Sequence, residues 1–166
     1  MLRLSGFPPI STPHARVLIL GTMPGVASLK AREYYAHPRN AFWPIMGEIF
    51  AARSNLSYVE RVKILNTRGI AVWDVLKYCQ RQGSLDSAIQ QEAPNAIAAF
   101  VAEHRQLVRI CFNGRKAEQL FRKLICIEGL PSLALLRFIA LPSTSPAYAS
   151  VSFDQKLKRW REGLGE

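Results

Sequence analysis

Four short runs of apolar residues stand out along the chain, and each is followed by a Gly, Asp, Asn or Pro residue. They cover residues 17–20, 70–73, 108–112 and 138–141. Continuous apolar runs of this length are typical of strands buried on both faces, as in a parallel sheet. The pattern therefore predicts four strands, with a loop from residue 74 to residue 83 after the second one.

Helical spacing of apolar residues occupies the stretches between these strands. The clearest case is residues 42–50, where apolar side chains recur at positions i, i+3, i+4, i+7 and i+8. Similar spacing predicts helices over 58–65, 96–103, 117–124 and 153–164, and Ser84 is a candidate helix cap. Strands that alternate with helices favour parallel pairing through crossover helices. We expect one α/β domain over residues 1–166, a three-layer α/β/α sandwich around a short, mostly parallel four-stranded sheet.

Charge makes the chain strongly basic. It carries 22 Lys and Arg against 12 Asp and Glu, a net charge of +10 and a pI near 10.0. The excess is +7 in residues 1–83 (11 basic, 4 acidic) and +3 in residues 84–166 (11 basic, 8 acidic). Such a balance indicates a nucleic-acid partner, although a basic protein with a merely solvated surface would show it too.

The composition argues against several other classes of protein. The three cysteines form no C-x-x-C pair and the three histidines are far apart, so we expect no disulfide framework and no metal site. No apolar run reaches the ~18 residues that span a bilayer, and the first residues do not resemble a signal peptide. We therefore expect a cytoplasmic protein with no membrane partner.

The segments that follow the four strands are expected to share one edge of the sheet. They are residues 21–25, Asp74 onward, Asn113 with Gly114, and residues 142–146. In open α/β sheets the ligand site lies outside the carboxyl ends of the strands. The first segment is neither G-x-G-x-x-G nor a P-loop. Its backbone amides could face a base or a phosphate, or it could be an ordinary tight turn.

Residues 34–43 combine aromatic, cationic and amide side chains in one segment. A flipped base and its phosphate require such a combination, a stacking face plus a charge. Tyr35, His37 and Asn40 lie off the apolar stripe of the helix, whereas Phe42 and Trp43 fit its core. Asn113 offers a donor and an acceptor to a base edge, and it could equally be a turn residue before Gly114.

These segments, in this order, resemble motifs of the uracil-DNA glycosylase superfamily over residues 17–149. Within it, the chain looks most like the DNA-deoxyinosine (hypoxanthine-DNA) glycosylase family. The mismatch-specific members carry a water-positioning Asn where this chain has Met23, and a thioether cannot orient a water. That departure favours the deoxyinosine family, in which a later amide, here Asn40, is implicated. The resemblance also implies that Tyr35 stacks on the extruded base, that residues 142–147 enter the minor groove, and that no cofactor is needed.

The resemblance implies a DNA glycosylase that removes a deaminated base, above all hypoxanthine, from DNA. No lysine stands out as a Schiff-base nucleophile, so we expect a monofunctional enzyme, and we expect it to be a monomer. Two alternatives stay open: a uracil-DNA glycosylase with broad or mismatch specificity, and a damaged-DNA-binding module without catalysis. The expected catalytic residues are Asn40 and Asn113. The expected substrate-binding residues are Gly21, Thr22, Met23, Pro24, Gly25, Tyr35 and Phe42. The expected DNA-binding residues are His37, Arg39, Ser143, Thr144, Ser145 and Pro146.

Overall fold

A parallel four-stranded sheet forms the centre of the protein. A computed structural model describes residues 3–166; Met1 and Leu2 lie outside the described residues. The strands β2 (Val17–Gly21), β3 (Ile70–Asp74), β6 (Arg109–Asn113) and β7 (Arg137–Leu141) pair in the order β3-β2-β6-β7, and every pairing is parallel. The four strands predicted from the apolar runs are confirmed, each to within about one residue.

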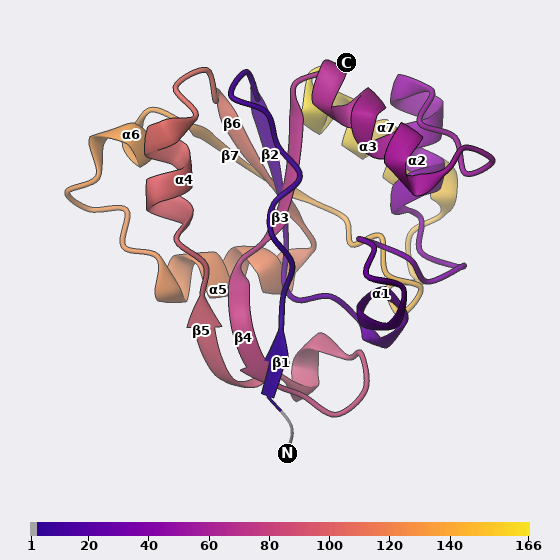
Figure 1. The fold of residues 1–166 in the computed structure, drawn as a ribbon, viewed down its shortest axis with the longest axis horizontal. Coiled ribbons are helices and arrows are strands. Elements are labelled where there is room, and N and C mark those ends of the chain that lie inside the picture. Colours follow the sequence, from indigo (N-terminus) through magenta and orange to yellow (C-terminus); the bar gives the residue numbers. More distant parts are fainter. Residues whose placement is uncertain (1–2) are drawn as a thin grey trace.

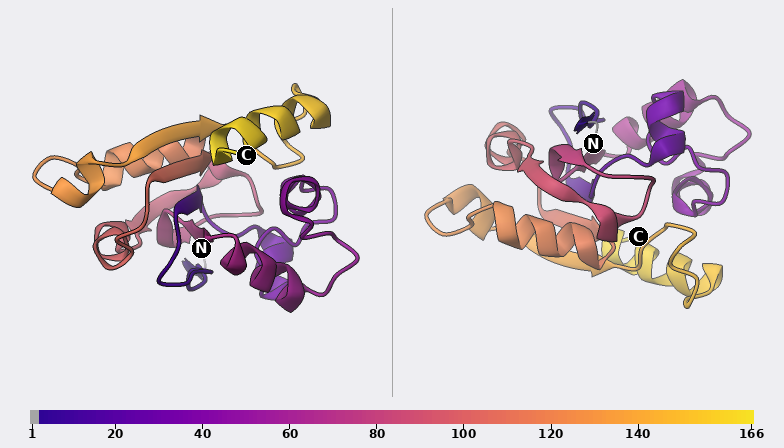
Figure 2. Two further views of the ribbon diagram at one scale, coloured as in Figure 1. Left: turned by 90° about the horizontal axis from the view of Figure 1, so that it is seen from above. Right: turned by 90° about the horizontal axis from the view of Figure 1, so that it is seen from below.

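Helices cover both faces of this sheet, so the three-layer sandwich is confirmed (Figures 1 and 2). In Figure 1, one layer lies on the right and the other on the left of the strands. The first layer comprises α1 (Val26–Ala31), α2 (Phe42–Phe50), α3 (Tyr58–Thr67) and α7 (Phe153–Leu164). The second comprises α4 (Ile97–Glu103), α5 (Arg115–Leu124) and α6 (Pro131–Ala134). Because the strand order reverses direction at β3, right-handed crossovers place the helices before β3 on one face and the helices between β3 and β7 on the other.

A second, smaller sheet occupies the region predicted as a loop, and that prediction is wrong. β1 (Arg3–Ser5), β4 (Leu76–Gln80) and β5 (Gln90–Pro94) form an antiparallel sheet in the order β1-β4-β5. β4 begins two residues after β3 ends, so the small sheet extends beyond the carboxyl edge of the large one (Figure 1). Between β4 and β5 lies the short 3-10 helix η1 (Asp86–Ala88).

Ser84 caps a helix, but a different one from the helix expected to follow it. Its Oγ accepts a hydrogen bond of 2.8 Å from the backbone N–H of Val26, at the start of α1. Side-chain caps satisfy amide groups that have no partner inside the helix. This contact fastens the segment before η1 to the segment that follows β2.

The core lies on both faces of the large sheet. All five residues of β2 and of β3 are buried, as the continuous apolar runs predicted. Trp160 of α7 is fully buried, and its indole N–H donates a hydrogen bond of 2.9 Å to the carbonyl of Pro142. α7 therefore supports the loop that leaves β7, at the edge of the sheet where the functional residues gather.

Candidate active site

A cavity of about 610 Å³ lies where the carboxyl ends of the parallel strands meet. Its walls come from six segments that are far apart in the sequence: residues 21–28, 34–40, 74, 84–86, 113 and 143–148. A volume of this size is typical of small-molecule sites. The position agrees with the rule for open α/β sheets that predicted it.

The turn after β2 is held in place by contacts with the segment between β4 and η1. Arg81, which is 4% exposed, donates from Nη2 to the carbonyl of Pro24 at 2.5 Å and from Nε to the carbonyl of Gly83 at 2.9 Å. The hydroxyl of Thr22 donates to Oδ1 of Asp86 at 2.7 Å. Residues 21–25 are therefore a fixed wall of the cavity.

Asp74, the last residue of β3, brings a buried carboxyl group to the cavity. Its side chain is 4% exposed, and its Oδ2 atom has no hydrogen-bond partner in the protein. Burial, and secondarily the Asp86 carboxylate, raise the pKa of Asp74 to about 7, against a smaller opposing effect of Arg81. The group therefore changes charge near neutral pH, which is characteristic of functional sites.

Tyr35 points its hydroxyl group into the same part of the cavity. Its backbone is left-handed, with φ of 55°, a conformation that non-glycine residues adopt rarely and often at functional sites. Hydrogen bonds hold both neighbours: the N–H of Tyr34 donates to the Tyr58 hydroxyl at 3.1 Å, and that of Ala36 donates to Ser28 Oγ at 3.1 Å. The Tyr35 hydroxyl is buried without a partner.

Phe42 does not line the cavity. It is fully buried in α2 and lies against the ring of Tyr35, with centroids 4.1 Å apart and planes 24° apart. Its place on the apolar stripe of the helix explains this position. Phe42 thus supports Tyr35 and covers one face of that ring, so a base could stack only on the other face.

Asn40 lines the cavity and lies two residues before the start of α2. Its Oδ1 accepts a hydrogen bond of 2.9 Å from the N–H of Phe42, which leaves the amide NH₂ group free of protein partners in the described chain. Nearby, His37 Nδ1 accepts from the N–H of Arg39 at 3.1 Å. Both His37 and Arg39 are exposed, so their side chains border the mouth of the cavity.

Asn113 and the loop after β7 form the opposite wall. Nδ2 of Asn113 donates to Thr144 Oγ1 at 2.9 Å, and Oδ1 accepts from the N–H of Thr144 at 2.9 Å. Asn113 and Thr144 are buried, while Ser143, Ser145 and Pro146 are partly exposed. Asn113 therefore orders the loop through both ends of its amide.

The structure brings together every predicted site residue except Phe42. The cavity also has lining residues that were not predicted as site residues, among them Tyr34, Asp74, Leu85 and Asp86. For Asp74 the signal existed, because an acidic residue directly after a buried strand belongs to the carboxyl edge of the sheet. For the residues of η1, no signal in the sequence indicated that they fold back over the cavity.

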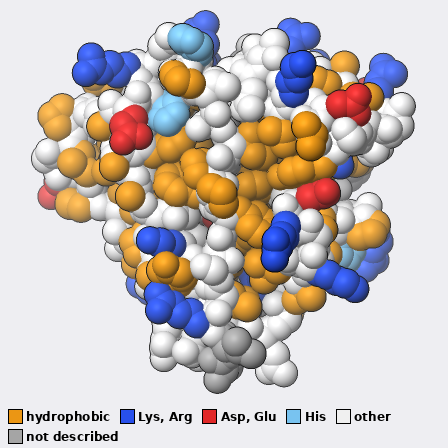
Figure 3. Space-filling model, in the orientation of Figure 1, with side chains coloured by type: hydrophobic (Ala, Val, Ile, Leu, Met, Phe, Trp, Pro, Cys, Tyr) orange, Lys and Arg blue, Asp and Glu red, His pale blue; other side chains and the backbone are white. Residues whose placement is uncertain are grey.

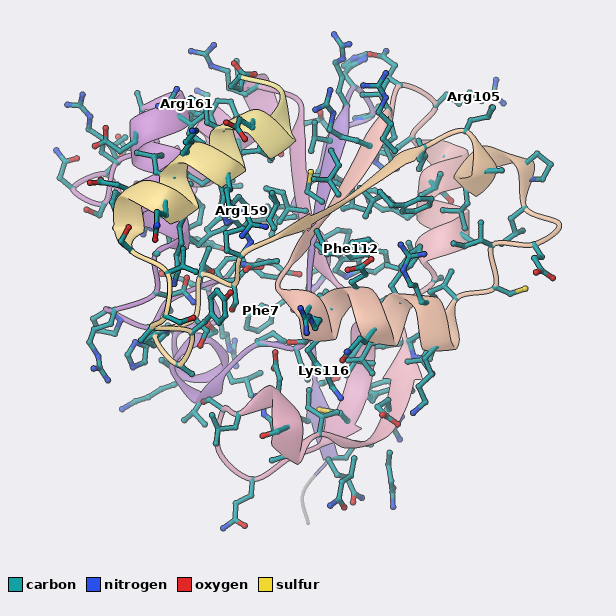
Figure 4. All side chains as sticks on the ribbon, turned by 180° about the vertical axis from the view of Figure 1, so that it is seen from behind. Phe7, Arg105, Phe112, Lys116, Arg159 and Arg161 are labelled. Carbon is teal, nitrogen blue, oxygen red and sulfur yellow. The ribbon has the colours of Figure 1, made fainter. Side chains whose placement is uncertain are left out.

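Positive charge is distributed widely around the molecule. Figure 3 shows Lys and Arg side chains scattered over one face, with hydrophobic side chains gathered near its centre. Lys116, near the start of α5, lies on the side of η1 (Figure 4), and its charge is one of those that lower the pKa of Asp86 against the raising effect of burial. Within residues 3–166, no three His, Cys, Asp or Glu side chains are grouped as a metal site requires, and no helix is long and apolar enough to cross a membrane.

Comparison with known proteins defines the class of protein to which this fold and cavity correspond. The family model described as the uracil DNA glycosylase superfamily matches residues 8–163, and the chain belongs to this superfamily of DNA glycosylases. The solved structure of a candidate uracil DNA glycosylase from Methanosarcina acetivorans, determined by solution NMR, superposes with a TM-score of 0.77. It is 31% identical, and the match covers 95% of this chain and 94% of that one.

Two curated relatives carry a more particular name. A protein named "Hypoxanthine DNA glycosylase" from Methanosarcina barkeri is 33% identical over 117 residues, which are 70% of this chain and 74% of the relative. A protein of the same name from Methanosarcina acetivorans is 36% identical over 113 residues, 68% of this chain and 72% of the relative. The resemblance seen in the motifs is thereby confirmed.

Proposed function

We propose that this protein removes hypoxanthine from deoxyinosine in DNA by hydrolysis of the N-glycosidic bond. The observation that carries the proposal is the cavity at the strand ends, which combines the size of a small-molecule site with polar groups at its floor and walls. An enzyme that acts on a base must take it out of the helix into such a pocket. The two relatives named hypoxanthine DNA glycosylases support the choice of base.

Asn40 is proposed to hold the attacking water. Its amide is neutral and cannot serve as a general base, but the NH₂ group that has no partner in the protein can orient a water and the base in line. Oδ1 is fixed by the N–H of Phe42, so the NH₂ group has a defined direction. Water adds to C1′ of the sugar through an oxocarbenium-like state, and the products are free hypoxanthine and an abasic site.

The cavity supports a monofunctional reaction. Strand cleavage by a glycosylase needs an amine that forms a Schiff base with the sugar, and the described residues that line the cavity include no Lys. The cationic and imidazole side chains among them are Arg39 and His37, at the mouth. We propose that these two residues and residues 143–146 contact the DNA strand, and that the chain acts as one domain and as a monomer.

A panel of oligonucleotides tests this function. Each duplex carries one hypoxanthine, xanthine, uracil or undamaged base, and is treated with hot alkali after incubation, with an untreated aliquot run beside it. We expect alkali-dependent nicks first and fastest at hypoxanthine. Faster release of uracil would favour the alternative uracil-DNA glycosylase. Gel retardation of the lesion duplex without nicks would indicate a binding module and contradict the proposal.

A further inference from the structure

Two buried polar atoms at the floor of the cavity lack partners in the protein. They are Oδ2 of Asp74 and the hydroxyl of Tyr35. A polar atom buried without a hydrogen bond costs free energy, so native proteins hold few of them. Both atoms belong to residues that line the same cavity, and a ligand that enters it can supply the missing hydrogen bonds.

The two groups converge above Gly21. A Cβ atom at that position would lie 2.5 Å from Asp74 Oδ1 and 2.9 Å from the Tyr35 hydroxyl. Glycine is needed here because any side chain would enter the space between them. Asp74 and the Tyr35 hydroxyl therefore both approach the end of β2 closely, a carboxyl group beside a phenol.

The surrounding charges give the Asp74 carboxyl and the Tyr35 hydroxyl complementary roles. Burial, and then the Asp74 carboxylate, raise the pKa of Tyr35 against a smaller opposing effect of Asn113, so its hydroxyl stays protonated and can donate. Asp74 faces Asp86 from η1, Arg81 from the end of β4, and Tyr34 and Tyr35 from the loop before α2. Since its pKa lies at about 7, Asp74 is ionised at pH 8 and then only accepts hydrogen bonds.

A donor beside an acceptor matches the group that deamination creates. Hypoxanthine presents a ring N–H beside a carbonyl, whereas adenine presents a bare ring nitrogen beside an amino group. We propose that Asp74 and Tyr35 together select the deaminated base, Asp74 by accepting from its ring N–H and Tyr35 by donating to its carbonyl oxygen. This rests on the proposed function and adds the residues that distinguish hypoxanthine from adenine.

Adenine is disfavoured because its ring nitrogen offers Asp74 no hydrogen bond to accept, and its amino group cannot accept the hydrogen bond that the Tyr35 hydroxyl donates to a carbonyl oxygen. Its bare ring nitrogen faces the ionised Asp74, and two acceptors cannot share a hydrogen bond. A site built to hydrogen-bond a substrate discriminates strongly against an analogue that leaves its buried polar groups unpaired. Tyr35 then acts through its hydroxyl, and the ring rests on Phe42.

The test measures binding and excision separately. Duplexes carry 2′-fluorinated deoxyinosine or 2′-fluorinated deoxyadenosine, since fluorine beside C1′ suppresses cleavage and allows equilibrium binding to be measured. We expect the wild type to prefer the inosine duplex, and Tyr35→Phe to weaken that preference by about 10- to 100-fold, the scale for one buried hydrogen bond. Tyr78→Phe makes the same chemical change outside the cavity and should leave the preference unchanged.

Asp74→Asn supplies a second, independent variant. An amide can present either its oxygen or its NH₂ group, so it pairs with both bases, and we expect the preference over adenine to fall. In the wild type, single-turnover excision of hypoxanthine should rise between pH 6 and pH 8 as Asp74 ionises, and Asp74→Asn should flatten this rise. Thermal unfolding of each variant checks that the fold is retained.

The outcomes separate the two proposals. If the wild-type protein binds the inosine duplex selectively but releases no base, the proposed function is contradicted, while selection of the base by Asp74 and Tyr35 is still supported. If the wild-type protein binds both duplexes equally, the proposal that Asp74 and Tyr35 select the base is overturned. A folded Tyr35→Phe variant with unchanged preference would also overturn it, and would leave base stacking as the role of that ring.

Discussion

Asn113 and Thr144 are joined by two reciprocal hydrogen bonds of 2.9 Å, one through each end of the Asn113 amide. Asn113 is the last residue of β6, and Thr144 lies in the loop after the adjacent parallel strand β7, 31 positions further along the sequence. Both are buried. This pair sets the position of the loop that is proposed to enter the minor groove.

Replacing Asn113 with Ala should therefore loosen the loop as well as destabilise the fold. The change leaves the N–H and hydroxyl of Thr144 buried without partners, which costs about 1–3 kcal/mol. We expect denaturant unfolding to show this loss and single-turnover excision to slow. Thr144→Ser keeps both hydrogen-bonding groups and should cost only about 1 kcal/mol for the lost methyl group. Equal behaviour of the two variants would contradict the assigned role.

Asn40 serves two purposes that mutation can separate. Asn40→Ala removes both the acceptor of the Phe42 N–H, at the start of α2, and the free NH₂ group. It should cut the excision rate by about 10²-fold or more, the scale for an oriented polar group, and lower stability by about 1 kcal/mol. Asn40→Ser retains an oxygen for the N–H of Phe42 and should restore stability alone. Near-normal excision by the Ser variant would assign the water to another residue.

Arg39, exposed at the mouth of the cavity, is expected to contact a DNA phosphate. Neutralised phosphates release counterions, so log affinity should fall linearly with log salt concentration. Arg39→Ala should weaken binding to damaged and undamaged duplex alike and reduce the slope by roughly one. Salt titrations of both duplexes measure this. Loss confined to the damaged duplex would make Arg39 a reader of the lesion.

Asp74 should make stability depend on pH in an unusual direction for a carboxyl group. Its pKa is raised from 3.8 in the unfolded chain to about 7 in the folded protein. The folded state therefore binds the proton more tightly, and the free energy of unfolding should fall as pH rises from about 4 to 7. Asp74→Asn should be more stable than the wild type at pH 8, by about 1 kcal/mol or more, and the difference should shrink at pH 5. A difference that does not change with pH would contradict the raised pKa of Asp74.

Much of the fold follows from local patterns, because buried parallel strands are continuous apolar runs and the helices carry one apolar stripe each. The small sheet could not be predicted in this way, because β4 (LKYCQ) and β5 (QQEAP) have no apolar run. Its strands depend on pairing with each other and with residues 3–5. The site residues after each strand could be predicted from the strand ends. The burial of Asp74 and its approach to Tyr35 could not, because they arise only when loops distant in sequence pack together.

Hydrogen bonds between segments that are distant in sequence hold the walls of the cavity together. Thr22 bonds to Asp86 across 64 positions, Arg81 to Pro24 across 57, and Asn113 to Thr144 across 31. Contacts between distant residues require large loops to close and tend to form slowly. During refolding, helical signal will return while the binding pocket is still unformed. We therefore expect the capacity to bind a ligand in this cavity to return later in refolding than the helices do.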